Sequence, residues 1–265
     1  MPTPEHIGRA GEAFGGVDIE RSTKTSASVA RWLATQIIEN GSLPGTPLPP
    51  ERDLAESFSI GRGTMREALR ILETFGLIEM RTGRYGGPVV KAPDARDLNV
   101  SLTLAFYANG SSMFDVLKAR MVIEPALAEM AARRITSEQL DQLRETIDVL
   151  RRPDASQAEY FRATERFHDV VLTQAADSSV LSQISAGLQR IGGGEIVGMS
   201  YMSRQRLATA SAHAAIVDAL HARDAELSHR LWKQHLEEAA AYWQREFPES
   251  ASKRIEWTIG LPSQR

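Results

Sequence analysis

Apolar and polar positions near the start of the chain follow first a helical and then an extended pattern. Between residues 26 and 41 apolar side chains recur every three or four positions, which predicts an amphipathic helix. Prolines exclude a regular helix at 43–50, because each removes a backbone donor and restricts the residue before it. Two short helices follow, the second from Arg62, and then residues 77–81 and 88–90 have the pattern of two strands joined by turn residues. This order predicts a helix-turn-helix with a two-stranded wing.

The helix predicted from Arg62 has two chemically different sides. On a helical projection Met65 and Leu69 lie on one side, whereas Arg66 and Arg70 lie on the other. In a helix-turn-helix the second helix enters the major groove, and side chains near its N-terminus reach the base edges. The planar guanidinium of arginine matches guanine O6 and N7, or a phosphate. We therefore expect the basic side of this helix to face DNA.

Beyond the first domain, the pattern of apolar residues predicts helices. Apolar runs at helical spacing are separated by residues that stop or start helices, such as Asn109-Gly110-Ser111 and Asp224. The expected helices are 99–108, 112–134, 137–152, 156–175, 179–202, 206–222 and 224–246. The predicted fold is therefore mainly α, with an N-terminal winged helix-turn-helix domain followed by an all-helical bundle of six to seven helices.

The same pattern predicts the domain boundaries. They are a disordered or loosely held tail at 1–24, a winged helix-turn-helix domain at 25–91, a linker at 92–98, a helical domain at 99–248 and a C-terminal tail at 249–265. A chain of 265 residues is long enough for two such domains.

Composition narrows the chemistry. The chain has no cysteine, which excludes disulfides, cysteine-ligated zinc sites, iron–sulfur clusters and cysteine nucleophiles, and favours the cytoplasm. No apolar stretch approaches 18 residues, so we expect no membrane span. Residues 21–95 hold ten basic and eight acidic side chains, whereas 96–248 hold seventeen and twenty. The first domain is thus mildly basic, as a DNA-binding domain would be.

Three blocks of the first domain resemble a known family. They are Leu-Pro-Pro-Glu-Arg-Asp-Leu-Ala, Arg-Gly-Thr-Met-Arg-Glu-Ala-Leu and Leu-Glu-Thr-Phe-Gly-Leu-Ile, and their order and spacing over about residues 26–91 resemble the GntR family of bacterial transcription regulators. The resemblance implies DNA contacts from Arg52, Arg62, Thr64, Arg66 and Gly83. Arg84, at the tip of the wing, is expected to reach the neighbouring minor groove.

The chain departs from this family at the start of the second helix. Gly61 and Gly63 stand where a Ser-Arg-Thr start is usual, which removes one or two hydroxyl contacts. The operator sequence therefore cannot be transferred from the family.

The second domain resembles FCD, the effector domain of the FadR-like branch of that family. The resemblance over 99–246 is carried by Arg120-Met-Val-Ile-Glu124-Pro, Glu129-Met-Ala-Ala, Phe167-His168, an Ala-Ala-Asp-Ser-Ser-Val-Leu stretch and two late histidines. It implies a homodimeric repressor, not an enzyme, that binds a palindromic operator on double-stranded DNA. The implied effector is a small organic acid, such as a carboxylate, sugar acid or amino acid, with acyl-CoA still open.

Three histidines are candidates for an effector and metal site. If the last two long helices form an antiparallel hairpin that turns near Asp224, His213 and His235 each lie eleven residues from the turn and reach the same height. His168 would complete a cluster of the type that holds Zn, Ni or Mn. The metal-binding version of the family has Asp four residues before the first histidine, where this chain has Thr164. An ion is therefore expected to bind less tightly, to take a ligand carboxylate or water instead, or to be absent.

Other residues leave alternatives open. Arg120 either forms an internal pair with Glu124, which i, i+4 spacing permits, or grips the carboxylate of an effector bidentately. The glycines at 192–194 are expected to mark a bend or a close approach, because glycine is costly inside a helix.

Two rival functions remain at this stage. The first is a metal-dependent enzyme that uses the three histidines, with Glu165 as the only evident base beside them. The second is a helical interaction protein that binds no ligand. An enzyme would not explain the first domain, and a flat thermal-shift screen with metals and organic acids would favour the interaction protein.

Overall fold

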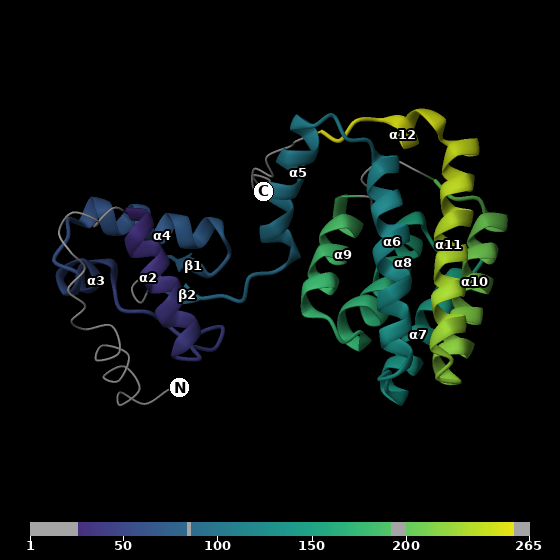
Figure 1. The fold of residues 1–265 in the computed structure, drawn as a ribbon, viewed down its shortest axis with the longest axis horizontal. Helices are drawn as coiled ribbons and strands as arrows, with labels where there is room; N and C mark the ends of the chain where they lie inside the picture. Colours follow the sequence, from purple (N-terminus) through teal and green to yellow (C-terminus); the bar gives the residue numbers. More distant parts are fainter. Residues whose placement is uncertain (1–25, 84–85, 192–199, 257–265) are drawn as a thin grey trace. The chain divides into compact units, whose positions relative to one another are not determined.

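A computed structural model describes residues 26–83, 86–191 and 200–256, which belong to two compact units (Figure 1). The first unit ends at Asp97 and the second begins at Leu98. Within the described ranges, no helix combines the length and the apolar character needed to cross a bilayer.

The first unit is a winged helix-turn-helix. Its elements are α2 (Ser26–Glu39), α3 (Glu51–Ser57), α4 (Arg62–Thr74), β1 (Ile78–Arg81) and β2 (Gly87–Val90). The two strands are antiparallel, with Ile78 opposite Val90 and Arg81 opposite Gly87. The order of elements confirms the prediction for this domain.

The apolar side of α4 forms the centre of this unit. Met65 and Leu69 are buried against Val29 and Leu33 of α2. Removal of each such side chain from water contributes roughly 1.5–3 kcal/mol, which fixes the orientation of α4. Its opposite, basic side therefore faces outward.

The proline-rich stretch between α2 and α3 is more ordered than the loop that the sequence predicts. Gly45 and Leu48 donate backbone hydrogen bonds to Val90 and Pro88, at 2.8 and 2.9 Å, and Val90 donates to Thr46. These bonds align the stretch with the outer edge of β2. The prolines bound the extended segment but do not prevent it from pairing, because the residues between them keep their donors.

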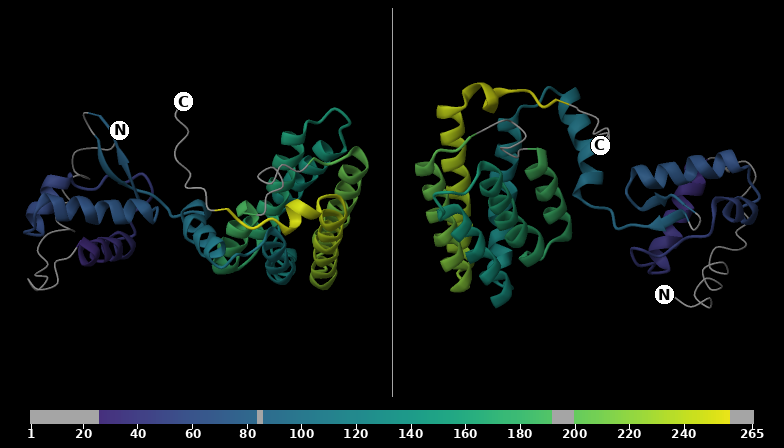
Figure 2. Two further views of the ribbon diagram at one scale, coloured as in Figure 1. Left: turned by 90° about the horizontal axis from the view of Figure 1, so that it is seen from above. Right: turned by 180° about the vertical axis from the view of Figure 1, so that it is seen from behind.

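The second unit is helical. Its elements are α5 (Ala95–Ala108), which begins just before the boundary between the units, α6 (Met113–Ala132), α7 (Ser137–Arg151), α8 (Gln157–Asp169), the π-helical turn η1 (Val170–Ala175), α9 (Ser179–Ile191), α10 (Ser203–His221), α11 (Ala225–Glu246) and α12 (Pro248–Ser252). Helix α6 lies between α9 and α11, and α7, α8 and α10 lie behind these three (Figures 1 and 2). α5 starts the unit beside α9, where Leu102 approaches Gly187.

Side chains at the helix starts explain several of these boundaries. Capping boxes begin α6 at Ser112, α7 at Thr136 and α8 at Ser156, each with a side chain that accepts from the third helical residue. Asp224 caps α11 by accepting from the backbone N–H of Leu227 at 2.9 Å. The hairpin of α10 and α11 therefore turns where the sequence predicts.

The structure differs from the sequence expectation at four places. α5 begins at Ala95, inside the predicted linker. The helix predicted over 156–175 changes to π-helix at Val170. Of the helix predicted over 179–202, the structure describes α9 as far as Ile191, and residues 200–202 are not helical. Part of the predicted C-terminal tail is folded, because Ile255 is buried and donates to the carbonyl of Ser111 at 2.9 Å. The tail at 1–24 and the glycines at 192–194 lie outside the described residues.

Candidate functional site

The exposed side of α4 carries the residues predicted to bind DNA. Arg62 and Arg66 are exposed, and Thr64 is half-buried between them in sequence. Arg52 on α3 is exposed and pairs with Asp53 at 3.0 Å. Burial of the apolar side of α4 thus presents a basic surface to solvent.

An ion pair that the sequence analysis did not predict holds Arg66. Glu51, in the first turn of α3, accepts from Arg66 Nη2 at 2.9 Å and from Nε at 3.3 Å. Pairs this exposed are worth only about 0.2–1 kcal/mol. Arg66 can therefore leave Glu51 for a base or a phosphate at little cost.

Two glycines leave the start of α4 open. A Cβ at Gly61 or at Gly63 would meet no atom within 4 Å, so packing does not require glycine at either position. Gly61 has an ordinary extended backbone, with φ of −66° and ψ of 145°, and no side chain caps the helix. The backbone N–H groups of the first turn are accordingly accessible to a phosphate.

Of the two wing residues predicted to contact DNA, the structure describes Gly83. Its φ of +107° is a conformation that glycine adopts readily, and nothing lies within 4 Å of where its side chain would be. Arg84, the other residue predicted to contact DNA from the wing, lies outside the described residues.

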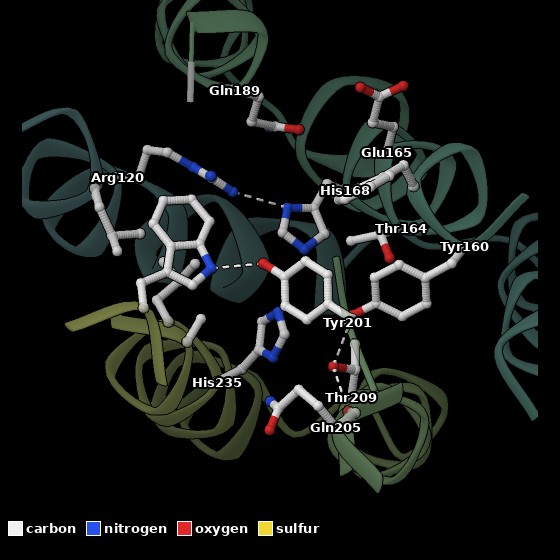
Figure 3. A pocket seen from close by; sticks show the side chains of 15 residues that line it. Arg120, Tyr160, Thr164, Glu165, His168, Gln189, Tyr201, Gln205, Thr209 and His235 are labelled. Atoms are coloured by element: carbon white, nitrogen blue, oxygen red, sulfur yellow. Dashed lines mark hydrogen bonds between the residues drawn. The ribbon is translucent and has the colours of Figure 1, made fainter. Parts of the chain in front are cut away.

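The second unit encloses a cavity of about 100 Å³ among α6, α8, α10 and α11 (Figure 3). Its lining comprises Leu117, Arg120, Tyr160, Phe161, Thr164, Glu165, His168, Gln189, Tyr201, Gln205, Thr209, His235, Leu236, Ala239 and Trp243. The lining thus combines aromatic side chains with Arg120, His168 and His235. Such a mixture of apolar surface with a few converging polar groups is typical of a small-molecule site.

Arg120 and Glu124 form the internal pair that their spacing permits. Arg120 Nε donates to Glu124 at 2.7 Å, and Nη2 lies 3.1 Å from His168 Nδ1. Glu124 is fully buried and also accepts from Trp232 Nε1 at 3.1 Å and from Ser185 Oγ at 3.3 Å. The carboxylate thus holds α6, α9 and α11 together, and it orients Arg120 toward the cavity.

The three predicted histidines converge. One ring nitrogen of each of His168, His213 and His235 lies within 4.8 Å of the others, and all three residues are buried. The ring of His213 stacks on Phe167 with centroids 3.7 Å apart. Among the described residues, His168 Nε2 and both ring nitrogens of His213 have no hydrogen-bond partner. Buried polar atoms without partners are rare in folded proteins, and a metal ion is one group that satisfies them.

Burial keeps these imidazoles neutral. Burial, helped by the Arg120 guanidinium and the other two imidazoles, lowers the pKa of His168 well below 6.5. Burial and His235 do the same for the pKa of His213, and burial and Arg120 lower the pKa of His235 to about 4. Neutral imidazole is the form that ligates Zn, Ni or Mn, so the residues fit such an ion.

The position that lacks the usual acidic ligand is also in the cavity wall. Thr164 lies one turn before His168 on α8, close to Tyr160. Figure 3 shows the carboxylate of Glu165 pointing away from His168 and His235, so Glu165 does not replace the missing acid. The described cluster therefore offers three neutral ligands and no carboxylate.

The sequence pattern does not predict the aromatic side chains that line the cavity. Tyr201 stacks on Tyr242 and lies against Tyr160, and its hydroxyl accepts from Trp243 Nε1. Two hydrogen bonds between its backbone and the Gln157 side chain, at 2.9 and 3.1 Å, hold it there. Since Tyr201 follows α9 in a segment that the sequence predicts as helix, no local pattern identified it as a pocket residue.

Comparisons with known proteins agree with both units. The family model for bacterial regulatory proteins of the gntR family matches residues 25–85, and the model for the FCD domain matches residues 115–238. The chain is 29% identical over 246 residues to the HTH-type transcriptional repressor NanR of Cronobacter sakazakii (strain ATCC BAA-894), which covers 88% of this chain and 90% of that protein.

A second relative and a solved structure extend the comparison. The galactonate operon transcriptional repressor of Escherichia coli (strain K12) is 31% identical over 166 residues, 60% of this chain and 70% of that protein. The structure of Streptococcus agalactiae GntR has a TM-score of 0.62 at 23% identity, and covers 82% of this chain and 99% of that one. This last likeness supports the fold alone.

Proposed function

Because this chain belongs to the GntR family of bacterial regulatory proteins and carries an FCD domain, we propose that it is a ligand-responsive repressor that binds a palindromic operator as a homodimer. The family comprises transcription regulators and not enzymes, which removes the metal-dependent enzyme as a rival. The observation that carries the proposal is the exposed basic side of α4 at an open helix start.

In this proposal α4 enters the major groove. Arg62 and Arg66 reach base edges or phosphates, and the first-turn amides and Thr64 bind phosphate. Arg52 braces α3 on the backbone, and Gly83 with Arg84 approaches the minor groove. Because Gly61 and Gly63 have no hydroxyl to contact DNA, recognition of the operator sequence depends mainly on the two arginines.

The cavity is proposed to bind a small organic acid. Its Arg120 uses Nε and Nη2 on Glu124 and His168, which leaves Nη1 for a ligand carboxylate. The amides of Gln189 and Gln205 and the Tyr160 ring suit the hydroxyls and C–H faces of a sugar acid. The name of the galactonate operon repressor supports that class of effector.

A divalent ion is proposed to bind at His168, His213 and His235. It would supply positive charge to a ligand carboxylate. Since the three imidazoles are neutral and Thr164 supplies no charge, a ligand acid would provide the missing anion, so acid and ion should bind cooperatively. The ligand would then act by favouring one arrangement of the two DNA-binding units over another. The shift in this equilibrium cannot exceed the difference between the ligand's affinities for the two arrangements.

The test begins with an operator selected from random DNA by the purified protein. We expect aldonic and uronic acids to reduce operator binding, and elemental analysis to find about one divalent ion per chain. The ion should bind at least severalfold more tightly with the acid than without it. If the protein selects no DNA sequence, the proposal that it is a transcription regulator is contradicted. If it selects an operator but no metal or acid shifts its melting temperature, DNA binding stands and the second unit is a helical domain without a ligand.

A further inference from the structure

The cavity in the second unit is small for the ligand that we propose to bind there. Its volume is about 100 Å³, whereas cavities that enclose a small-molecule ligand usually measure about 300–1,000 Å³. A short acid such as glycolate is much smaller than a six-carbon sugar acid such as galactonate. The cavity as it stands therefore suits the short acid, and the sugar acid can enter only if a side chain of the lining moves.

Tyr201 differs from the other residues that line this cavity. Each of the others belongs to α6, α8, α9, α10 or α11, whereas Tyr201 precedes the start of α10 and has no regular secondary structure. Its neighbour Met202 is 76% exposed, so the backbone here lies at the surface while the Tyr201 ring lies among the lining side chains (Figure 3). The ring can therefore leave the cavity for solvent without a change in any helix.

The Tyr201 side chain covers two groups that suit a sugar. Its ring lies against that of Tyr160, with centroids 5.1 Å apart. Its hydroxyl accepts a hydrogen bond from Trp243 Nε1 at 2.5 Å, which Figure 3 shows as a dashed line to the indole nitrogen. A flat ring with a hydroxyl thus occupies both the aromatic surface and the N–H donor that the C–H groups and hydroxyls of a sugar acid would use.

The backbone and the side chain of Tyr201 are held by different contacts. Two hydrogen bonds to the Gln157 amide fix the backbone, and Arg206 Nε also donates to the Tyr201 carbonyl, at 3.2 Å. The side chain is held by the Trp243 hydrogen bond and by ring contacts such as that with Tyr242. One hydrogen bond and a few ring contacts stabilise little in net terms. A ligand that replaces them can therefore displace the ring by rotation of the side chain, with the backbone in place.

We propose that Tyr201 determines which acids the cavity admits, because its ring occupies the space that the carbon chain of a sugar acid needs. The inference rests on the organic-acid effector of the proposed function and adds a residue that selects the effector by size. A short acid binds beside Arg120 and the histidines with the ring in place. A sugar acid binds only to molecules in which the ring has left, so its apparent affinity is its intrinsic affinity multiplied by the fraction of such molecules.

Removal of the ring tests this proposal by the sign of its effect. Isothermal titration calorimetry measures the binding of galactonate and of glycolate to the full-length wild-type protein and to Tyr201→Ala. We expect Tyr201→Ala to bind galactonate at least about fivefold more tightly, because no ring has to be displaced, and to bind glycolate with unchanged affinity.

Two further variants control for other effects of the substitution. Tyr201→Phe keeps the ring but loses the hydrogen bond to Trp243, so its affinity for galactonate should lie between those of the wild type and Tyr201→Ala. Tyr107→Ala removes an exposed tyrosine of α5 and should bind both acids as the wild type does. Far-UV circular dichroism confirms folding of each variant.

Fluorine NMR detects the displacement directly and does not require Tyr201→Ala to fold. The chain has five tyrosines, so labelling with fluorotyrosine gives five resonances, and Tyr201→Phe identifies the one that belongs to Tyr201. With saturating galactonate this resonance should shift when water is exchanged for heavy water, as expected for a ring in solvent. With saturating glycolate it should remain insensitive to the exchange.

The outcomes separate this proposal from the function on which it rests. If the wild-type protein binds galactonate and Tyr201→Ala binds it equally or more weakly, Tyr201 does not exclude the sugar acid, and the organic-acid effector stands. A Tyr201 resonance that saturating galactonate leaves unchanged also contradicts the proposal. If neither protein binds either acid, the effector of the proposed function fails, and the selection by Tyr201 with it.

Discussion

At the residue scale, the centre of the second unit depends on charges that are buried with their partners. Arg120 lies between two of these partners: its Nε donates to Glu124, and its Nη2 lies within hydrogen-bond distance of His168 Nδ1. Spacing of four residues permits the Arg120–Glu124 pair, which the sequence leaves as one of two alternatives. It does not predict the Trp232 and Ser185 donors to Glu124, because these come from residues 108 and 61 positions away in sequence.

Glu124→Gln should destabilise the protein strongly. The substitution keeps the shape of the side chain but leaves the Arg120 guanidinium buried without its counterion, which costs about 3–5 kcal/mol. Urea unfolding measures the change. The matched control is Glu226→Gln, because Glu226 forms an exposed i, i+4 pair with Arg230 and its loss should cost less than about 1 kcal/mol. Equal effects of the two variants would contradict a structural role for Glu124.

The buried histidines should make stability depend on pH. In the folded state the pKa of each of His168, His213 and His235 lies below 6.5, and that of His235 lies at about 4. The unfolded chain therefore takes up protons first as the pH falls below about 6.5, and each histidine then favours unfolding by up to about 1.4 kcal/mol per pH unit.

Unfolding by urea in the presence of a chelator, at pH 7 and at pH 5.5, measures this effect. We expect the free energy of unfolding to be clearly smaller at pH 5.5 than at pH 7. His213→Phe, which keeps an aromatic ring against Phe167, should reduce the dependence. A free energy of unfolding that is unchanged between the two pH values would mean that the histidines are not buried as neutral groups.

At the element scale, helices whose apolar residues lie on one side could be predicted from the sequence, and segments held by distant partners could not. α2, α4 and α7 begin and end close to the predicted residues. The hairpin turn at Asp224 was also predictable, since equal distances from that cap bring His213 and His235 to one height. By contrast, Tyr201 is positioned by Gln157 and Trp243, which no local pattern connects to it.

Gly61→Ser should stabilise α4. Gly61 already has the backbone conformation of a helix N-cap, a side chain there meets nothing, and serine adds an acceptor for the first turn. Together with the lower entropy of the unfolded chain, we expect a gain of about 0.3–1 kcal/mol in the free energy of unfolding. Gly61→Ala is the control, since it supplies the entropy effect without the cap. Destabilisation by both variants would show that Gly61 is required for packing.

At the scale of the whole molecule, the two units have separate hydrophobic cores and separate chemistry. The outward arginines of α4 belong to the first unit, and the cavity with its histidines belongs to the second. Changes at α4 should therefore alter DNA affinity without altering ligand affinity. Signalling between the units requires only that the ligand bind one arrangement of them better than another.

Titration of fluorescently labelled operator tests the central claim most directly. With salt held constant, we expect Arg62→Ala and Arg66→Ala each to weaken specific binding by about 1–3 kcal/mol. Arg144→Ala, an exposed arginine on α7, is the control and should bind as the wild type does. Binding curves for both α4 variants that superimpose on the wild-type curve would show that this helix does not read DNA.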